Sequence, residues 1–600
     1  MTSSIDPITL ELIQSKITSI VEEMRVVLFH SGYSTVLRES EDGSAGLLDA
    51  ALRTAAVSKK LPFHFASFSA VQEHLPRYFA PADLHEGDVL LFNHPFEGNV
   101  THTSDTVTLM PVFFDGRIVA YSGTLAHKPD LGGVRGLTAA RDLWEEGLVL
   151  PPVKYLVRGE VNRDVERIVG ANSRIPSETL GDLRGQIASC GVGARRLQEL
   201  CTRFGPETFT AACRELMNRV AGRLRGALRG MPDGCHEAEG LLDHDNVNLA
   251  RSIRVHVAIT KADDRVIFDF TGSDRQADGA VNLVPPMVKN SCYCALMAMT
   301  DANLPFNHGF VEVVETRFRP GTIVCPDPGA AVSHYTPLAH LVCDMAVKAL
   351  GQFCPERAAA SAGGGGSIRL MGKSPSGESW VLMELLNTAQ GASAGRDGVN
   401  LIHGPLGAGQ FRPGPIEIHE SEFPLRITRF SVTPNSGGAG KFRGGMGSTR
   451  EYQALTEAAV PVRSLKGSLR GKLPPWGIFG GRAARVGDVF VNGLSVPDGT
   501  REVFLKPGDL IRVETNAGGG VGDPLERAPE RVLGDVLDGY VTIDAAREDY
   551  GVVIDSSTRE IDFDSTIKQR ALRRVLAQAN AGDLPSNRVG SPAAGKRSPT

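Results

Sequence analysis

The first thirty residues alternate apolar and polar positions at the spacing of an α-helix. Asp6 and Pro7 supply an N-cap and a proline at the first helical position, and Gly32 follows the last apolar position. Between them, apolar residues recur every three or four positions: Leu10, Ile13, Ile17, Ile20, Val21, Met24, Val27 and Leu28. This pattern predicts an amphipathic helix that begins at Pro7 and packs its apolar face in a core.

Short apolar runs then predict strands at residues 88–92, 106–114 and 117–126. Asp115-Gly116 separates the last two runs, and Asp-Gly between apolar runs is typical of a two-residue hairpin turn. In the simplest register residue 114 faces residue 117. Ser104 then faces His127, at the open end of the hairpin.

The rest of the chain mixes both periodicities. Helical spacing recurs at 163–230, 284–300, 337–353, 527–537 and 544–550, and alternation predicts strands within 251–272. From residue 361 the chain is rich in Gly and in strand-like runs. We predict an α+β, multi-domain protein with mixed sheets, an N-terminal helix, a helical segment and a strand-dominated C-terminal half. The expected divisions are 1–235, with a metal site and the helical segment; 236–360, mixed α/β; 361–565, Gly-rich and β-dominated; and 566–600, a short helix and a disordered tail.

Composition narrows the class of protein. The 600 residues carry a net charge of -5, which gives no electrostatic case for binding nucleic acid or an anionic membrane. The nine cysteines are dispersed and form no CxxC pair, as expected of reduced thiols in a cytoplasmic protein. The N-terminus lacks the pattern of a signal peptide, and no apolar run approaches the ~18 residues that span a membrane.

The hairpin predicts a candidate metal site. Its open end gathers His102, Asp105, His127 and Asp130, a set of imidazoles and carboxylates that suits zinc, manganese or iron. In the simplest register Asp105 points to the wrong face, so it joins the cluster only if the strand bends or bulges. The alternative is that these are solvated loop residues.

A glycine-rich stretch at residues 363–374, GGGGSIRLMGKS, is similar to a phosphate-binding loop. Five residues separate Gly366 from Gly372, where the motif needs four, and Pro375 follows where a helix should begin. We therefore expect no nucleotide site here, and expect any nucleotide to bind on another subunit.

Several blocks together carry a family resemblance. They are DPITLELI, NHPFEG…THTSD, AHKPDLGG, EEGLVLPPVK, ANSRIPSETLGDLRGQ, NSGGAGKFRGGMG, PPWGIFGG, GGGVGDPLER and DGYVTIDAAREDYGVV. In these the chain resembles the hydantoinase B/oxoprolinase family from Asp6 to about Ile554. That family comprises partner subunits of ATP-dependent hydantoinases, 5-oxoprolinases, lactamases and acetone or acetophenone carboxylases.

The resemblance implies a set of ligands for a divalent metal (Zn, Mn or Fe). Carried over residue by residue, they are Asp42, His102, Asp105 and His127. Asp130 and His94 are then expected to orient a ligand imidazole. The resemblance also implies a hetero-oligomer in which a hydantoinase A-type subunit, rather than this chain, binds ATP with Mg.

The function expected from the resemblance is hydrolysis of a cyclic amide that the partner has activated with ATP. An ATP-dependent ketone carboxylase subunit and a non-catalytic scaffold subunit are the alternatives. The chain departs from the family pattern at His94, where an Asp is usual, by one extra residue before Thr101, and at Lys128, where a second His is frequent. The family segment H-M-T-N-T-R is replaced by residues 401–415.

Overall fold

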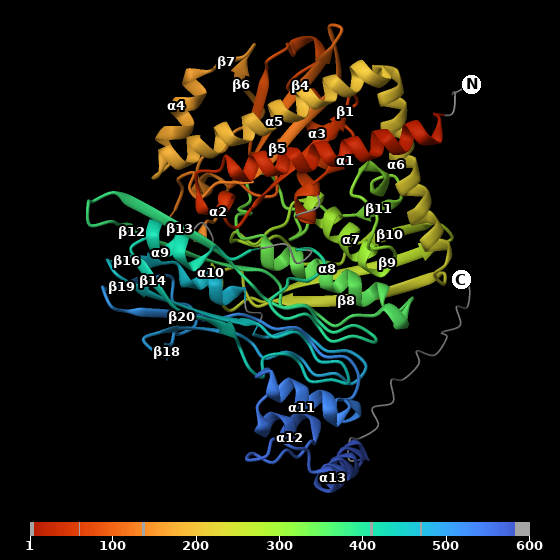
Figure 1. Ribbon diagram of the computed structural model, residues 1–600, viewed down its shortest axis with the longest axis vertical. Helices are drawn as coiled ribbons and strands as arrows, with labels where there is room; N and C mark the ends of the chain where they lie inside the picture. The colour runs from red at the N-terminus through yellow and green to blue at the C-terminus, as the bar shows by residue number, and fades with distance from the viewer. Residues whose placement is uncertain (1–4, 59–60, 135–138, 408–411, 469–470, 583–600) are drawn as a thin grey trace, which may run out of the picture.

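The computed structural model describes residues 5–58, 61–134, 139–407, 412–468 and 471–582. Within them the chain forms four β-sheets, with helices around and between them (Figure 1). The predicted α+β, multi-domain class with a strand-dominated C-terminal half is confirmed. The domain boundaries at residues 235, 360 and 565 remain a prediction.

The first sheet has seven antiparallel strands in the order β2-β1-β5-β4-β3-β6-β7. Helices α1, α5 and α6 share an apolar core with one face of this sheet, and the short helix α3 packs on the other (Figure 1). The elements of this region are α1 (Pro7–His30), α2 (Thr35–Arg38), β1 (Gly43–Asp49), β2 (Thr54–Val57), α3 (Phe65–His74), β3 (Val89–Phe92), β4 (Asp105–Phe114), β5 (Arg117–His127), β6 (Val153–Val157), β7 (Glu160–Val161), α4 (Arg163–Ala171), α5 (Pro176–Phe204) and α6 (Pro206–Arg229).

Helix α1 forms as the sequence predicted. The Asp6 carboxylate accepts a hydrogen bond from the backbone N–H of Thr9 at 2.9 Å, which caps the helix. Apart from Val27, the predicted apolar stripe is buried. The first helix thus packs its apolar face against the sheet.

The β4–β5 hairpin differs from the predicted register by one residue. The turn is as expected, since Asp115 and Gly116 both have positive φ (49° and 75°) and Phe114 faces Arg117. A bulge between Val112 and Phe113 then shifts the pairing, because Val119 is an extra residue in β5. The prediction that Ser104 faces His127 is therefore wrong: Asp105 does.

The middle of the chain forms a four-stranded sheet in the order β11-β10-β9-β8 and two buried helices. Both predicted helices and the strands predicted within 251–272 are confirmed. The elements are β8 (Gly234–Leu242), β9 (Ile253–Ala262), β10 (Arg265–Asp269), α7 (Pro285–Met299), β11 (Val314–Arg317) and α8 (Thr336–Leu350).

The Gly-rich half contains two sheets, β13-β12-β16-β19 and β14-β15-β20-β17-β18. The stretch that is similar to a phosphate-binding loop forms strand β12, which turns directly into β13. Glycines serve close backbone approach here: a Cβ on Gly444 would lie 1.8 Å from the carbonyl oxygen of Gly518. The elements are β12 (Gly366–Lys373), β13 (Ser379–Leu386), α9 (Ile416–Glu422), β14 (Leu425–Val432), β15 (Ser448–Ala454), β16 (Ala458–Val460), α10 (Val462–Gly467), β17 (Asp488–Val491), β18 (Leu494–Ser495), β19 (Val503–Leu505) and β20 (Leu510–Glu514).

Three helices end the described chain: α11 (Pro529–Leu537), α12 (Ile543–Tyr550) and α13 (Phe563–Gly582). They form a separate layer below the C-terminal sheets (Figure 1). The disordered tail predicted within 566–600 falls largely on residues 583–600, which lie outside the described residues. Among the described residues no helix is both long enough and apolar enough to cross a membrane.

Candidate metal centre

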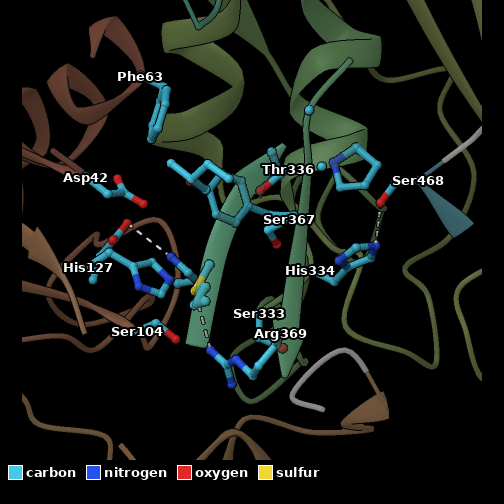
Figure 2. Close-up of a pocket in the computed structure, with 18 of the residues that line it drawn as sticks. Asp42, Phe63, Ser104, His127, Ser333, His334, Thr336, Ser367, Arg369 and Ser468 are labelled. Atoms are coloured by element: carbon cyan, nitrogen blue, oxygen red, sulfur yellow. Dashed lines mark hydrogen bonds and ion pairs between the residues drawn. The ribbon is translucent and has the colours of Figure 1, made fainter. Parts of the chain in front are cut away.

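A cavity of about 120 Å³ lies where the N-terminal sheet meets the C-terminal half. One wall comes from the open end of the β4–β5 hairpin, and the opposite wall from the β12–β13 hairpin and the segment before α8 (Figure 2). Asp42, His102, Asp105 and His127 all line it. The four residues that the family resemblance implies as ligands therefore share one cavity.

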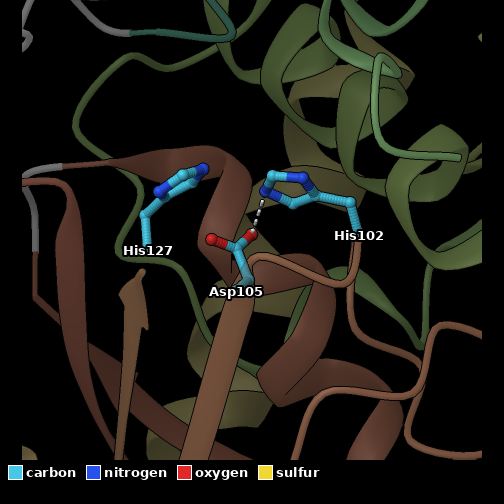
Figure 3. A group of neighbouring side chains, drawn as sticks. All are labelled: His102, Asp105 and His127. Carbon is cyan, nitrogen blue, oxygen red and sulfur yellow. Dashed lines mark ion pairs between the residues drawn. The ribbon is translucent and has the colours of Figure 1, made fainter. Parts of the chain in front are cut away.

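Three of these side chains form a compact cluster. One potential ligand atom from each of His102, Asp105 and His127 lies within 4.8 Å of the other two, and all three residues are buried. The Asp105 carboxylate lies between the two imidazoles (Figure 3). The bulge in β5 explains this, because it places Asp105 directly opposite His127. The sequence analysis required a bend or bulge for Asp105 to join the cluster, and the structure contains this bulge.

Charge is distributed unevenly over the cluster. Burial alone would lower the pKa of His102, but Asp105, with Oδ2 3.3 Å from the His102 Nε2, raises it above its usual range. Burial likewise opposes ionisation of Asp105, yet His102 holds the pKa of that carboxyl well below its usual range. Burial and then His102 depress the pKa of His127, so its imidazole is neutral.

The hydrogen bonds of the cluster leave ligand atoms unused. The Thr101 hydroxyl donates to Oδ2 of Asp105 at 2.5 Å. The other carboxylate oxygen, Oδ1, and the Nδ1 atoms of His102 and His127 are buried without a hydrogen-bond partner. Buried polar atoms are normally satisfied, so unsatisfied atoms on all three residues of one buried cluster mark it as a candidate binding site. Two imidazoles and a carboxylate fit a transition metal.

Asp42 lies beside this cluster, just before β1. Its backbone carbonyl accepts a hydrogen bond from the N–H of His127 at 3.1 Å, which fixes its place at the sheet end. Its Oδ1 lies 3.5 Å from Nε2 of His64. Asp42 also helps to raise the pKa of His102, so its charge acts on the cluster.

Sequence reasoning missed His64. It lies at the start of α3, fully buried, with its Nδ1 2.8 Å from the Ser44 hydroxyl. Burial lowers its pKa to about 4, so the ring is neutral. In the sequence, His64 lies within the apolar run LPFHF and so has the pattern of a core residue. Its position beside the cluster is evident only from its contact with Asp42 in the structure.

The structure gives His94 and Asp130 other partners than the predicted ones. The Asp130 carboxylate accepts two hydrogen bonds from Arg174, one from the backbone N–H and one from Nη1, each at 2.5 Å. His94 Nδ1 accepts from the backbone N–H groups of Phe96 and Glu97, both at 3.1 Å, within its own turn. In the described part of the chain neither residue lines the cavity or hydrogen-bonds to a ligand imidazole. The predicted orienting role is therefore not supported.

A second buried acid, Glu146, positions the opposite wall. It accepts hydrogen bonds from the backbone N–H groups of Val332 and Ser333, and from the Thr103 hydroxyl at 3.3 Å. Burial raises its pKa to about 7. The segment that it holds leads to Tyr335, whose ring centroid lies 5.0 Å from that of His102. Glu146 therefore links the cluster to the wall that faces it, a link between distant segments that no local pattern signals.

Residues 6–524 match the family described as hydantoinase B/oxoprolinase. The chain is 32% identical to the B component of a putative D-/L-hydantoinase from a Pseudomonas strain, over 94% of this chain and 98% of the relative. It is similar to the crystal structure of an ATP-dependent caprolactamase from Pseudomonas jessenii, with a TM-score of 0.85 and 28% identity over 95% of this chain and 100% of that one. A nucleotide-free acetone carboxylase shares the fold, with a TM-score of 0.86 at 19% identity over 97% of this chain and 84% of that one. The chain belongs to the hydantoinase B/oxoprolinase family.

Proposed function

We propose that this protein is the metal-binding component of an ATP-dependent enzyme that hydrolyses a cyclic amide, such as a hydantoin, a lactam or 5-oxoproline. The observation that carries the proposal is the buried cluster of His102, Asp105 and His127, with its ligand atoms within 4.8 Å of one another. The relatives support the substrate class, since one is named as part of a hydantoinase and one is an ATP-dependent caprolactamase.

We assign the metal to His102, Asp105 and His127, with Asp42 as a further oxygen ligand. The donor set suits Zn, Mn or Fe. When bound, such an ion makes water a stronger nucleophile and stabilises negative charge on oxygen. Only a neutral imidazole offers a lone pair to a metal. The lowered pKa of His127 keeps its ring neutral, whereas His102, whose pKa is raised, would release a proton on metal binding.

The chain's own residues prepare the site for that chemistry. Asp105 is held ionised by His102, and Thr101 fixes the carboxylate by its hydrogen bond. Glu146 holds the segment before α8, which forms the opposite side of the cavity, with Tyr335 against His102. The burial of the cluster excludes bulk water, so a single bound water can be oriented.

We further propose that ATP is used by a hydantoinase A-type partner, which transfers a phosphoryl group to the amide oxygen. Water then adds to the activated carbon, and the ring C–N bond breaks as the nitrogen takes up a proton, which leaves an acyl phosphate. A second water hydrolyses the acyl phosphate to a carboxylate and inorganic phosphate. Two observations support a separate nucleotide-binding chain. The residues that are similar to a phosphate-binding loop form strand β12, and a relative is named as one component of a hydantoinase.

The test is metal analysis of the purified protein, followed by turnover in the assembled complex. We expect about one transition-metal ion per chain, and loss of both metal and ATP-dependent hydrolysis in His102→Ala. His85→Ala is the matched control, because the His85 side chain is 43% exposed and does not line the cavity. A metal-free wild-type protein, or His102→Ala with full turnover, would refute the assignment.

One further assay separates the proposed reaction from its alternatives. The complex is incubated with ATP, labelled bicarbonate and a ketone. Incorporation of label would identify a carboxylase and overturn the hydrolase proposal. A partner that is fully active without this chain would instead identify a scaffold.

A further inference from the structure

A single arginine stands out in the wall opposite the metal cluster. Strand β12 alternates, so that Ile368 and Leu370 are buried in the C-terminal core while Ser367 and Arg369 face the cavity. Their cross-strand partners on β13, Leu385 and Met383, line the cavity too. Figure 2 shows the Arg369 side chain at this wall.

The Arg369 guanidinium has no carboxylate partner in the described part of the chain. Its hydrogen bond is to the sulfur of Met383, with Nη2 3.6 Å from Sδ. Asp130 is the acid that acts on it most strongly, but Arg174 already binds both oxygens of that carboxylate. Burial accordingly lowers the pKa of Arg369.

Arg369 is half-buried, and an arginine that is partly removed from water without an anionic partner is less stable than one that meets an anion. The planar guanidinium matches the oxygens of a carboxylate or a phosphate, with two parallel hydrogen bonds. Hydroxyl groups of Ser333, Thr336 and Ser367 line the same cavity (Figure 2). The wall thus offers a fixed positive charge with neutral donors around it.

We propose that Arg369 binds an anionic oxygen group, a carboxylate or a phosphate, of the molecule that occupies this cavity. The inference rests on the proposed function in one respect: that molecule is the substrate or its phosphorylated form. The anion is held at β12 while the rest of the molecule extends toward His102, Asp105 and His127. Arg369 is close enough to this cluster to add to the lowering of the His127 pKa, after burial and His102. It is therefore a binding and specificity-determining residue.

The test measures binding of two probes to the full-length protein after treatment with a chelator. Inorganic phosphate and acetate are titrated separately by calorimetry. We expect at least one probe to bind, and Arg369→Met to weaken that binding at least tenfold. Arg369→Lys should bind with intermediate affinity, because it keeps the charge but loses the two parallel hydrogen bonds. Arg426→Met is the matched control, since Arg426 is exposed on β14 and does not line the cavity.

The two probes distinguish the source of the anion: binding of phosphate alone supports a phosphoryl group, and binding of acetate alone supports a substrate carboxylate. Binding of neither, or equal binding by wild type and Arg369→Met, overturns the proposal. If Arg369→Met does not fold, Arg369→Lys decides, and wild-type affinity in that variant overturns it. Because metal and partner are absent from this assay, a failed metal analysis would refute the proposed function alone.

Discussion

Buried arginines tie the C-terminal helices to the rest of the molecule, and removing one of them, Arg527, should loosen these helices selectively. Arg527 is 1% exposed and lies between two carboxylates. Its guanidinium donates to Asp397 at 2.7 and 2.9 Å and to Asp535 of α11 at 2.7 and 3.1 Å. The perturbation is Arg527→Met, which keeps much of the side-chain volume but removes the charge.

The free-energy cost of Arg527→Met depends on which ion pairs Asp397 and Asp535 keep in the variant. Removing one partner of a buried ion pair costs about 3–5 kcal/mol, because the other charge remains buried and unpaired. Here Asp397 keeps Arg531 at 2.6 Å, and Asp535 keeps Arg443 at 2.8 Å. We therefore expect the lower end, about 3 kcal/mol. This corresponds to about a 100-fold increase in the population of open α11.

Hydrogen exchange read by mass spectrometry measures this opening directly. Amide exchange in the α11 peptide should accelerate about 100-fold in Arg527→Met, while peptides of α1 keep their wild-type rates. Arg531→Met is the matched control. Arg531 also binds Asp397, but its side chain is 47% exposed, so its removal should lower the free energy of opening α11 by less than about 1 kcal/mol. Equal acceleration in the two variants would refute the argument from burial.

Two further predictions concern the cavity. Gly366 lines the cavity, and a Cβ added there meets nothing within 4 Å, so the Gly366→Val variant should fold normally. When two cyclic amides are compared in the assembled complex, the variant should lower kcat/KM at least about tenfold more for the larger one. An equal loss of kcat/KM for both amides would contradict this prediction. Glu146, 1% exposed, has its pKa raised by burial from 4.5 to about 7, so the native state keeps a proton that the unfolded state releases. Stability should fall by about 3 kcal/mol between pH 4.5 and 7 and then level off. In denaturant unfolding, the free energy of unfolding of Glu146→Gln should decline less steeply than that of the wild type between pH 4.5 and 7. If the two proteins lose stability in parallel, Glu146 is not the source of the pH dependence.

Much of the secondary structure could be predicted because it is encoded locally. The Asp6 cap, the apolar stripe of α1 and the Asp115-Gly116 turn each act within a few residues, and each has the predicted consequence. The Gly-rich stretch at 363–374 departs from a phosphate-binding loop in its spacing and at Pro375, and residues 366–373 form strand β12. Each of these features depends on residues that are close together in the sequence.

The parts of the site that were missed depend on contacts between distant segments. His64, Glu146 and Arg369 are far apart in the sequence, and only folding brings them to the site. Arg369 lines the cavity, His64 lies beside Asp42, and Glu146 contacts Thr103 and the segment before α8. His94 and Asp130 show the converse. Both lie close in sequence to ligand-type residues, but Asp130 binds Arg174 and His94 binds its own turn. Nearness in sequence is therefore weak grounds for assigning a role at a metal site.

The one-residue shift in the β4–β5 hairpin shows how a fold can create a site that its strand pattern does not predict. Without the bulge, side-chain alternation would place Asp105 and His127 on opposite faces, and the two imidazoles would share no carboxylate. With the bulge, Asp105 and His127 face each other as the pair at the open end of the hairpin. The bulge lies at the turn end of the hairpin, between Val112 and Phe113, so the paired strand between transmits the shift without distorting the cluster itself. A rigid ladder thus holds Asp105 and His127 in register, as a metal site with fixed ligand geometry requires.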